Sequence, residues 1–179
     1  MSRKTACEVV TFPAPCTAER SDVYTVTAGG GEVFVERFYD VDYAHFAFSG
    51  ECEVTVCIPP SIGHRNLHFI NDYSIRPKRA GVSATTEVNA LTFRLSEPKK
   101  LIITINEYRR LFIFADSIDE DAPEPGGRDV VNFADFAADK EGEALQTANI
   151  ARAVEAVPKG GVLYFPPGLY RSGTFALKS

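Results

Sequence analysis

Short stretches of alternating apolar and polar residues follow one another through the first two thirds of the chain, and they constrain its fold more than any other feature. The alternation is clearest in 43–49, where Ala44, Phe46 and Phe48 share one face, and it recurs in 51–58. A period of two residues is typical of half-buried β-strands. Before residue 116, no segment sustains the 3.6-residue period of a helix.

The other predicted strands in this region are equally short, and turns rich in glycine and proline separate them. They are 23–27, 32–36, 66–70, 73–76, 87–95, 100–106 and 110–115. Many short strands at this spacing predict a β-sandwich or a β-barrel. We therefore expect an N-terminal β-sandwich domain over residues 1–115.

The segment 116–128 is acidic, rich in proline and glycine, and almost free of large apolar residues. This composition predicts an exposed linker between domains. Its carboxylates could suggest an acid pair or a calcium site, but their spacing is not that of a calcium loop, and a solvated linker is favoured. They are Asp116, Asp119, Glu120, Asp121 and Glu124.

From residue 129 the pattern changes. Residues 143–157 form the only predicted helix, with Thr147, Ile150, Val154 and Val157 on one face. Short strands are predicted around it, at 129–133, 162–165, 169–171 and 174–177. Gly160 and Gly161 allow a sharp entry into the strand that follows the helix.

Three runs in this region have the character of a family signature: Leu145-Gln-Thr-Ala-Asn-Ile150, Gly160-Gly-Val-Leu-Tyr-Phe-Pro-Pro-Gly-Leu-Tyr170 and Ser172-Gly-Thr174. They resemble the opening of the pectin-lyase-like enzymes, particularly the polygalacturonase-like members of glycosyl hydrolase family 28. In that family, a helix precedes a Gly-Gly-x-Val-x-x-Pro-x-Gly-x-Tyr segment that forms the first coil of a right-handed parallel β-helix. The family usually shows Gly-Ala-x-Gly-Asp-Gly before the helix, whereas this chain has Phe136-Ala-Ala-Asp-Lys-Glu-Gly142.

Two runs in the first domain, Tyr43-Ala-His-Phe-Ala-Phe-Ser-Gly50 and Arg110-Leu-Phe-Ile-Phe-Ala-Asp116, add a second likeness. They are similar to the N-terminal β-sandwich of some polygalacturonase-like and dextranase-like proteins. Together the resemblances imply a mostly β chain: a sandwich at 1–115, a linker at 116–128, and a capping helix with the first β-helix coil at 129–179.

The resemblance implies a parent protein that hydrolyses glycosidic bonds in a pectin-like (polygalacturonan) or related polysaccharide. Such enzymes use one carboxyl group to protonate the leaving oxygen and another to activate water. The family's Asp-bearing motifs and its Gly-His-Gly segment lie in middle coils, and no segment here matches them. We therefore expect no catalytic residue, cofactor site or metal site before Ser179, and an inactive segment. A polysaccharide lyase or depolymerase on the same scaffold and a non-enzymatic carbohydrate-binding module stay open.

The spacing Cys52-x₄-Cys57-x₆-His64-x₃-His68 superficially resembles that of zinc ligands. The middle gap is too short for a zinc finger, and the two cysteines point to opposite faces of one predicted strand. We therefore expect core cysteines, surface histidines and mostly free thiols at all four cysteines, which include Cys7 and Cys16. His45 is expected on the polar face of its strand.

Two small basic groups could contact an acidic sugar, although solvated turns are the favoured interpretation. They are Arg76, Lys78 and Arg79, and Arg109 with Arg110. Four tyrosines could stack on sugar rings, although strand tyrosines more often pack at sheet edges. They are Tyr39, Tyr43, Tyr108 and Tyr170.

The net charge of −5 argues against a nucleic-acid binder and gives no sign of membrane recruitment. The longest apolar runs fall well short of the ~20 residues that a membrane-spanning helix needs. The sequence has no Gly-x-Ser-x-Gly elbow, phosphate loop or dinucleotide fingerprint. We expect a polysaccharide or oligosaccharide partner, and homo-oligomer formation stays open. A basic N-terminus without an apolar run predicts a cytoplasmic protein, or a secreted one whose signal was removed.

Overall fold

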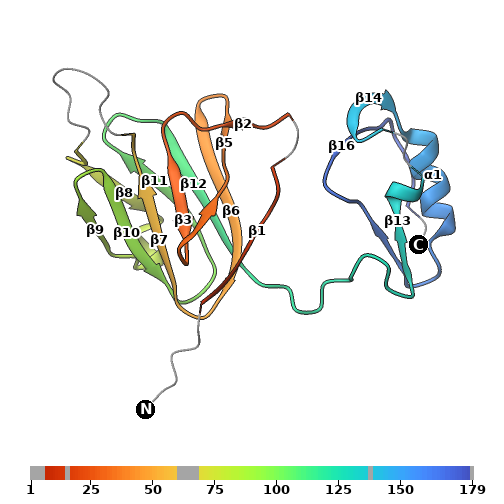
Figure 1. Cartoon of the computed structure of the whole chain (residues 1–179), viewed down its shortest axis with the longest axis horizontal. Helices are drawn as coiled ribbons and strands as arrows, with labels where there is room; N and C mark the ends of the chain where they lie inside the picture. Colours follow the sequence, from red (N-terminus) through yellow and green to blue (C-terminus); the bar gives the residue numbers. More distant parts are fainter. Residues whose placement is uncertain (1–6, 15–16, 60–68, 137–138, 178–179) are drawn as a thin grey trace, which may run out of the picture. The chain divides into compact units, whose positions relative to one another are not determined.

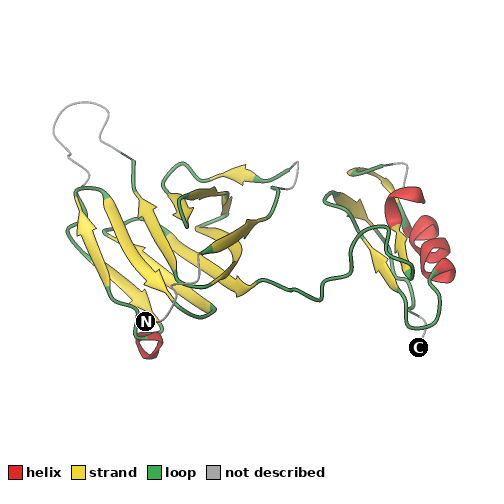
Figure 2. Ribbon diagram, turned by 60° about the horizontal axis from the view of Figure 1, so that its bottom comes forward, coloured by secondary structure: helices red, strands yellow, loops and turns green. Residues whose placement is uncertain are grey.

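The computed structural model describes residues 7–14, 17–59, 69–136 and 139–177, and the chain separates into two compact units (Figure 1). The first unit ends at Ile118, and the second begins at Asp119. Strands make up 47% of the described residues, and the prediction of a mostly β fold is confirmed. Figure 2 shows that strands dominate the first unit and that the longest helix belongs to the second.

The first unit contains two β-sheets. The larger has seven strands in the order β2-β5-β6-β12-β11-β8, and β1 pairs with β6 beyond the end of β5. Neighbouring strands in this sheet run antiparallel, except β6 and β12, which run parallel. Its strands are β1 (Glu8–Thr11), β2 (Glu19–Arg20), β5 (Val35–Phe38), β6 (Val41–Ser49), β8 (Tyr73–Arg76), β11 (Lys99–Ile105) and β12 (Arg110–Ser117).

The smaller sheet has five antiparallel strands in the order β4-β3-β7-β10-β9. A short 3₁₀ turn, η1 (Lys78–Ala80), leads from the larger sheet to the smaller one. The strands are β3 (Thr25–Ala28), β4 (Gly31–Val33), β7 (Cys52–Cys57), β9 (Ala84–Glu87) and β10 (Ala90–Leu95).

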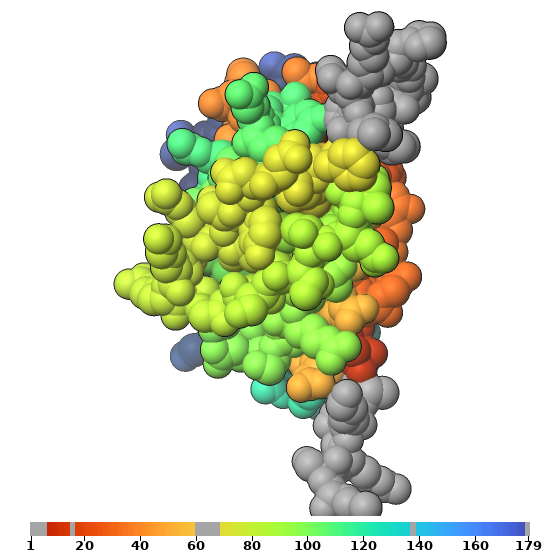
Figure 3. All heavy atoms as spheres, turned by 90° about the vertical axis from the view of Figure 1, so that its left-hand side faces the viewer, coloured from red at the N-terminus to blue at the C-terminus, as the bar shows by residue number. Residues whose placement is uncertain are grey.

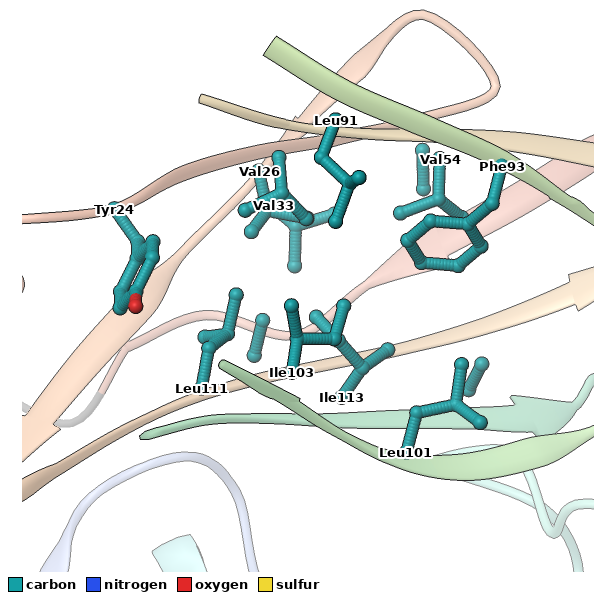
Figure 4. Packing of buried hydrophobic residues seen from close by; sticks show 14 of the residues in the cluster. Tyr24, Val26, Val33, Val54, Leu91, Phe93, Leu101, Ile103, Leu111 and Ile113 are labelled. Carbon is teal, nitrogen blue, oxygen red and sulfur yellow. The ribbon is translucent and has the colours of Figure 1, made fainter. Parts of the chain in front are cut away.

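The two sheets face each other across one hydrophobic core (Figure 4). Alternate residues of each strand point into it, as the period of two requires. Val54 and Leu91 from the smaller sheet oppose Ile103 and Ile113 from the larger one, and all four are fully buried. Burying a side chain of this size stabilises a fold by about 1.5–3 kcal/mol. This packing is that of a β-sandwich.

The structure corrects several predicted strands. The predicted strand 32–36 is divided at Phe34, because β4 belongs to the smaller sheet and β5 to the larger. The predicted strand 87–95 is two strands, because Val88 has a positive φ of 55° and turns the chain between β9 and β10. Of the predicted strand 66–70, residues 66–68 lie outside the described residues, and Phe69 and Ile70 are not in a strand. The sequence reading also missed β1 and β2, which are too short to show alternation.

The second unit is built on two parallel strand pairs and one α-helix. β13 pairs with β15, and β14 pairs with β16. The elements are β13 (Val130–Asn132), the 3₁₀ turn η2 (Phe133–Asp135), β14 (Glu141–Leu145), α1 (Thr147–Ala156), β15 (Val162–Tyr164) and β16 (Leu169–Arg171). The strand predicted at 174–177 is not formed.

The helix starts later than the predicted residue 143, because the residues before it form β14. The side chain of Asp139 accepts hydrogen bonds from the backbone N–H groups of Ala144, at 2.6 Å, and of Glu141, at 2.8 Å. These bonds lower the pKa of Asp139 and hold the chain in an extended turn. Local side-chain bonding of this kind competes with helix formation.

The predicted apolar stripe of the helix is buried at its centre. Ile150, Ala153 and Val154 pack with Phe133 as the core of the second unit, whereas Thr147 and Val157 are only partly buried. At the far end of the helix, a Cβ on Gly161 would lie 2.6 Å from the carbonyl oxygen of Asp129, so only glycine fits this entry into β15. In the described part of the chain, no helix has the length and apolar character needed to span a membrane.

We predict that Ile150→Asp destabilises the second unit by about 3 kcal/mol or more, because an unpaired carboxylate would be buried against Phe133. The matched control is Ala151→Asp, which places the same charge on the exposed side of the same helix. Urea-dependent pulse proteolysis measures the stability of each variant. Equal stability of the two variants would contradict this packing.

Candidate functional site

The side of the seven-stranded sheet that faces away from the core carries three partly exposed aromatic rings. Tyr43 on β6 and Phe112 and Phe114 on β12 alternate with buried core residues, so they point outward. The centroids of the two phenylalanine rings are 6.4 Å apart, and the rings are nearly parallel, at 19°. Tyr43 meets Phe114 edge-on, also at 6.4 Å. We call these three residues the outer aromatic face.

Strand pairing extends this face into a row across the sheet. Phe112 pairs with Tyr43 on one side and with Ile102 on the other, and Ile102 pairs with Arg76 of the edge strand β8. Lys100 occupies the corresponding position beside Phe114. The row therefore runs from an aromatic centre to a basic edge.

A hollow of about 410 Å³ lies at this basic edge, lined by Arg76, Pro77, Lys78 and Ile102. The edge belongs to the end of the sandwich that faces the viewer in Figure 3, where the segments from β8 to β10 are coloured yellow to green. Arg76 and Lys78 are both exposed, so their charges are open to solvent and to ligands.

Acidic groups also lie beside the outer aromatic face. Glu36 pairs with Tyr43 across the strands, and burial together with a hydrogen bond to Glu36 raises the pKa of Tyr43 to about 12. His45 Nε2 lies 3.1 Å from Asp116 Oδ2, and the ring of Phe12 stacks on the imidazole at 4.4 Å. His45 is therefore on the solvent side of its strand, as predicted.

The position of Asp116 differs from the prediction. It was expected in the solvated linker, but it lies in β12, which continues to Ser117 because its parallel pairing with β6 extends to Phe48. The other linker carboxylates are exposed, as expected of a solvated segment. They are Asp119, Glu120, Asp121 and Glu124.

The lysines and arginines of the described sandwich fall into two groups. Those of the first group pair with carboxylates: Arg20 with Glu32, Arg37 and Arg109 with Asp22, Arg109 also with Asp42, Arg94 with Glu53, and Lys99 with Glu97. Those of the second group form no ion pair with any described carboxylate, and all lie on or beside β8, β11 and β12. They are Arg76, Lys78, Arg79, Lys100 and Arg110.

Arg109 and Arg110 are neighbours in sequence but have different surroundings. Arg109 Nε lies 2.9 Å from Oδ2 of the fully buried Asp42, and its Nη2 lies 2.5 Å from Asp22 Oδ1. The hydrogen bond from Arg109 lowers the pKa of Asp22. The hydroxyl of Tyr24 donates to the backbone oxygen of Arg109, at 2.6 Å. This network fixes the turn before β12 and is structural, whereas Arg110 is exposed.

The other three candidate tyrosines are not part of the outer aromatic face. Tyr39 is 82% exposed in the turn between β5 and β6. Tyr108 packs against Tyr24, and Tyr170 packs edge-on against Phe133 in the second unit, at 5.1 Å. Of the four, only Tyr43 is available to this site.

A larger hollow, of about 600 Å³, lies beside β9 and β10 of the five-stranded sheet and is also lined by Lys99 of β11. Glu53 and Arg94 in its wall pair with each other, as do Glu97 and Lys99. Phe93, the aromatic residue among its lining residues, is buried in the core. With its charges paired and its aromatic ring turned inward, this hollow is less suited to binding a sugar.

The zinc-like spacing does not form a site in the described residues. Cys52 is buried and Cys57 is half-buried on the other face of β7, as predicted, while His64 and His68 lie outside the described residues. Across the parts of the chain that the structure describes, no three His, Cys, Asp or Glu side chains come together as metal ligands. Cys7, Cys52 and Cys57 are free thiols, and Cys16 lies outside the described residues.

Sequence reasoning missed Phe112 and Phe114 as candidate binding residues. The available signal was the run Arg110-Leu-Phe-Ile-Phe-Ala, in which large apolar residues occupy both faces of one strand. Leu111 and Ile113 fill the core, so the two phenylalanines between them must lie on the outer side.

No family model matches the sequence, and no curated protein matches it. Among solved structures, the chain is similar to Dex49A from Penicillium minioluteum, a dextranase of glycoside hydrolase family 49. The identity is 15%, the TM-score is 0.54, and the match covers 89% of this chain and 38% of Dex49A. The chain thus spans well under half of that protein. The likeness shows a β-rich fold similar to that of Dex49A and does not single out family 28.

We predict that Arg109→Leu destabilises the sandwich by about 3–5 kcal/mol, because it leaves the carboxylate of Asp42 buried without its partner. Arg110→Leu is the matched control, since this arginine is exposed and has no described carboxylate partner. Urea denaturation followed by far-UV circular dichroism measures the free energy of unfolding of both variants. A loss of similar size in the two variants would show that the buried pair is not the cause.

We predict that Cys52 reacts slowly with iodoacetamide at pH 8 in the native protein. Burial, together with the adjacent thiol of Cys7, raises the pKa of Cys52 to about 12, so almost none of it is thiolate at this pH. Peptide mass spectrometry reports labelling at each cysteine, with Cys57 as the half-buried reference. Denatured, non-reduced protein should label at all four cysteines. Native labelling of Cys52 at the rate of Cys57 would refute the prediction.

Proposed function

We propose that the chain is the N-terminal part of a glycoside hydrolase that acts on a polysaccharide. In this proposal it supplies an accessory β-sandwich and the start of a catalytic parallel β-helix. The observation that carries the proposal is the similarity to Dex49A, a dextranase, over 89% of the chain. Neither unit alone makes up that share of the chain, so the similarity includes parts of both.

The strand pairing of the second unit supports a β-helix. Val130 pairs in parallel with Val162, and Glu141 pairs in parallel with Leu169. In a solenoid each coil pairs with the next one at a repeat of roughly 20–50 residues, and both of these separations fall in that range. The helix α1 lies between β14 and β15 in the sequence and packs on Phe133, and in the proposal it caps the β-helix.

Exposed apolar side chains on the second unit support further coils. Leu145 is 68% exposed and Leu177 is 74% exposed, and Phe165, Leu169 and Phe175 are also exposed. A coil of a solenoid buries its apolar residues only by stacking on its neighbours. In the proposal, coils that follow Ser179 cover these side chains and bring the catalytic carboxylates.

The proposed substrate is an acidic, pectin-like polysaccharide, because the sequence resembles polygalacturonase-like enzymes and the sandwich exposes unpaired arginine and lysine side chains. A neutral glucan is the second candidate, since Dex49A is a dextranase. Hydrolysis of either polymer requires two carboxyl groups on opposite sides of the scissile bond.

We predict that a longer protein containing this chain cleaves polygalacturonate or dextran, whereas the 1–179 segment cleaves neither. A reducing-end assay measures hydrolysis, and absorbance of an unsaturated product detects a lyase. Turnover by the purified 1–179 segment would place the active site within it. A longer protein that binds these polymers without cleaving them would replace the enzyme proposal with a binding function.

A further inference from the structure

We infer that the outer aromatic face and the unpaired basic residues beside it form a binding site for an acidic polysaccharide. The site lies entirely in the sandwich, on β6, β8, β11 and β12. The inference goes beyond the proposed function, because a sandwich with this site would bind its polymer whether or not the parent protein cleaves it.

The aromatic rings provide the surface on which sugar rings can pack. One face of a pyranose presents C–H groups, and such faces pack against aromatic rings as other apolar groups do. Phe112 and Phe114 are successive outward residues of one strand, with parallel rings 6.4 Å apart. Tyr43 meets them from the neighbouring strand. Two adjacent, parallel rings suit a polymer, because consecutive sugars can each contact one ring.

The basic residues provide the selectivity for acidic sugars. Arg76 and Lys100 stand at the positions next to Ile102 and Phe114, on the same side of the sheet as the rings. Both are exposed, and neither has a carboxylate partner among the described residues. Hydrogen bonds from arginine and lysine to a carboxylate are about twice as strong as neutral ones. A uronate carboxylate would supply the partner that these side chains lack.

The distribution of charge strengthens this assignment. The whole chain has a net charge of −5, and the paired arginines show that carboxylates are abundant elsewhere in the sandwich. The unpaired cations nevertheless gather on or beside β8, β11 and β12, near the hollow of about 410 Å³ lined by Arg76 and Lys78. Clustered cations on an acidic protein create a local positive potential that attracts anionic ligands.

Acidic groups beside the rings favour a sugar over a nucleic acid. Glu36 flanks Tyr43, and Asp116 is exposed beside His45. Carboxylates accept hydrogen bonds from hydroxyl groups, which every unit of a polyuronate carries and the sugar-phosphate backbone of DNA lacks. A face with rings in the centre, cations at one edge and carboxylates beside the rings matches a polymer that carries both hydroxyls and carboxylates.

Isothermal titration of the 1–179 chain with oligogalacturonate, dextran oligosaccharides and single-stranded DNA of similar length tests the inference. Oligogalacturonate should bind, and more weakly at high salt, because salt screens the exposed charges. The double variant Arg76→Gln/Lys100→Gln should lose on the order of tenfold or more in affinity. The matched control Arg94→Gln removes an arginine from the other sheet, where it pairs with Glu53, and should bind like the parent chain.

A second pair of variants isolates the rings. Phe112→Leu keeps an apolar side chain without a ring and should weaken binding, whereas Phe112→Tyr keeps the ring and should bind like the parent chain. Melting temperatures verify that each variant is folded. If the face were instead an apolar docking surface for a protein, the Phe112→Leu variant would still bind its partner, and the charge variants would bind with nearly unchanged affinity.

The inference is overturned if oligogalacturonate does not bind, if DNA or dextran binds as tightly, or if Arg94→Gln weakens binding as much as the double variant. Cleavage by the longer protein is measured separately. If the longer protein cleaves the polymer but the 1–179 chain does not bind it, only this inference is removed. If the 1–179 chain binds the polymer but the longer protein does not cleave it, only the proposed hydrolase activity is removed.

Discussion

The parallel pairing of β6 and β12 is the contact on which the sandwich and its candidate site both depend. It joins residues about seventy positions apart and runs from Arg110 beside Val41 to Ser117 beside Phe48. Each pairing step sets one residue toward the core and the next toward solvent. A shift of one residue would place Phe112 and Phe114 in the core and expose Leu111 and Ile113. The register therefore fixes the core and the outer aromatic face together.

The arginine and lysine side chains of the sandwich differ in whether they form an ion pair with a carboxylate. Arg109 is held by Asp42 and Asp22 and stabilises the turn before β12, whereas Arg110, the next residue, stays unpaired on the outer side. The sheet face that carries exposed rings also carries unpaired cations, while the larger hollow beside β9 and β10 has its charges paired. Cations that pair with carboxylates stabilise the sandwich, whereas exposed cations without a described carboxylate partner can bind an anionic ligand.

In the second unit, one aromatic side chain lies at the centre of a small core. Phe133 is fully buried and contacts Ile150 and Val154 of the helix as well as the rings of Phe165 and Tyr170. The two parallel strand pairs leave apolar residues such as Leu145 and Leu177 exposed. That combination is what the proposed first coil of a solenoid requires, because each coil depends on the next for burial.

The sequence by itself determined that the chain is mostly β, that Cys52 and Cys57 point to opposite faces, and that Ile150 and Val154 form a buried stripe, because these features depend on local periodicity. It did not determine where 32–36 divides between sheets, where the helix begins, or that Asp116 belongs to a strand, since each depends on a partner distant in sequence. The same limit applies to the candidate site. The sequence marks Arg76 and Tyr43 as candidates but not Lys100 or Phe112, and only strand pairing across the seven-stranded sheet places all four on one surface.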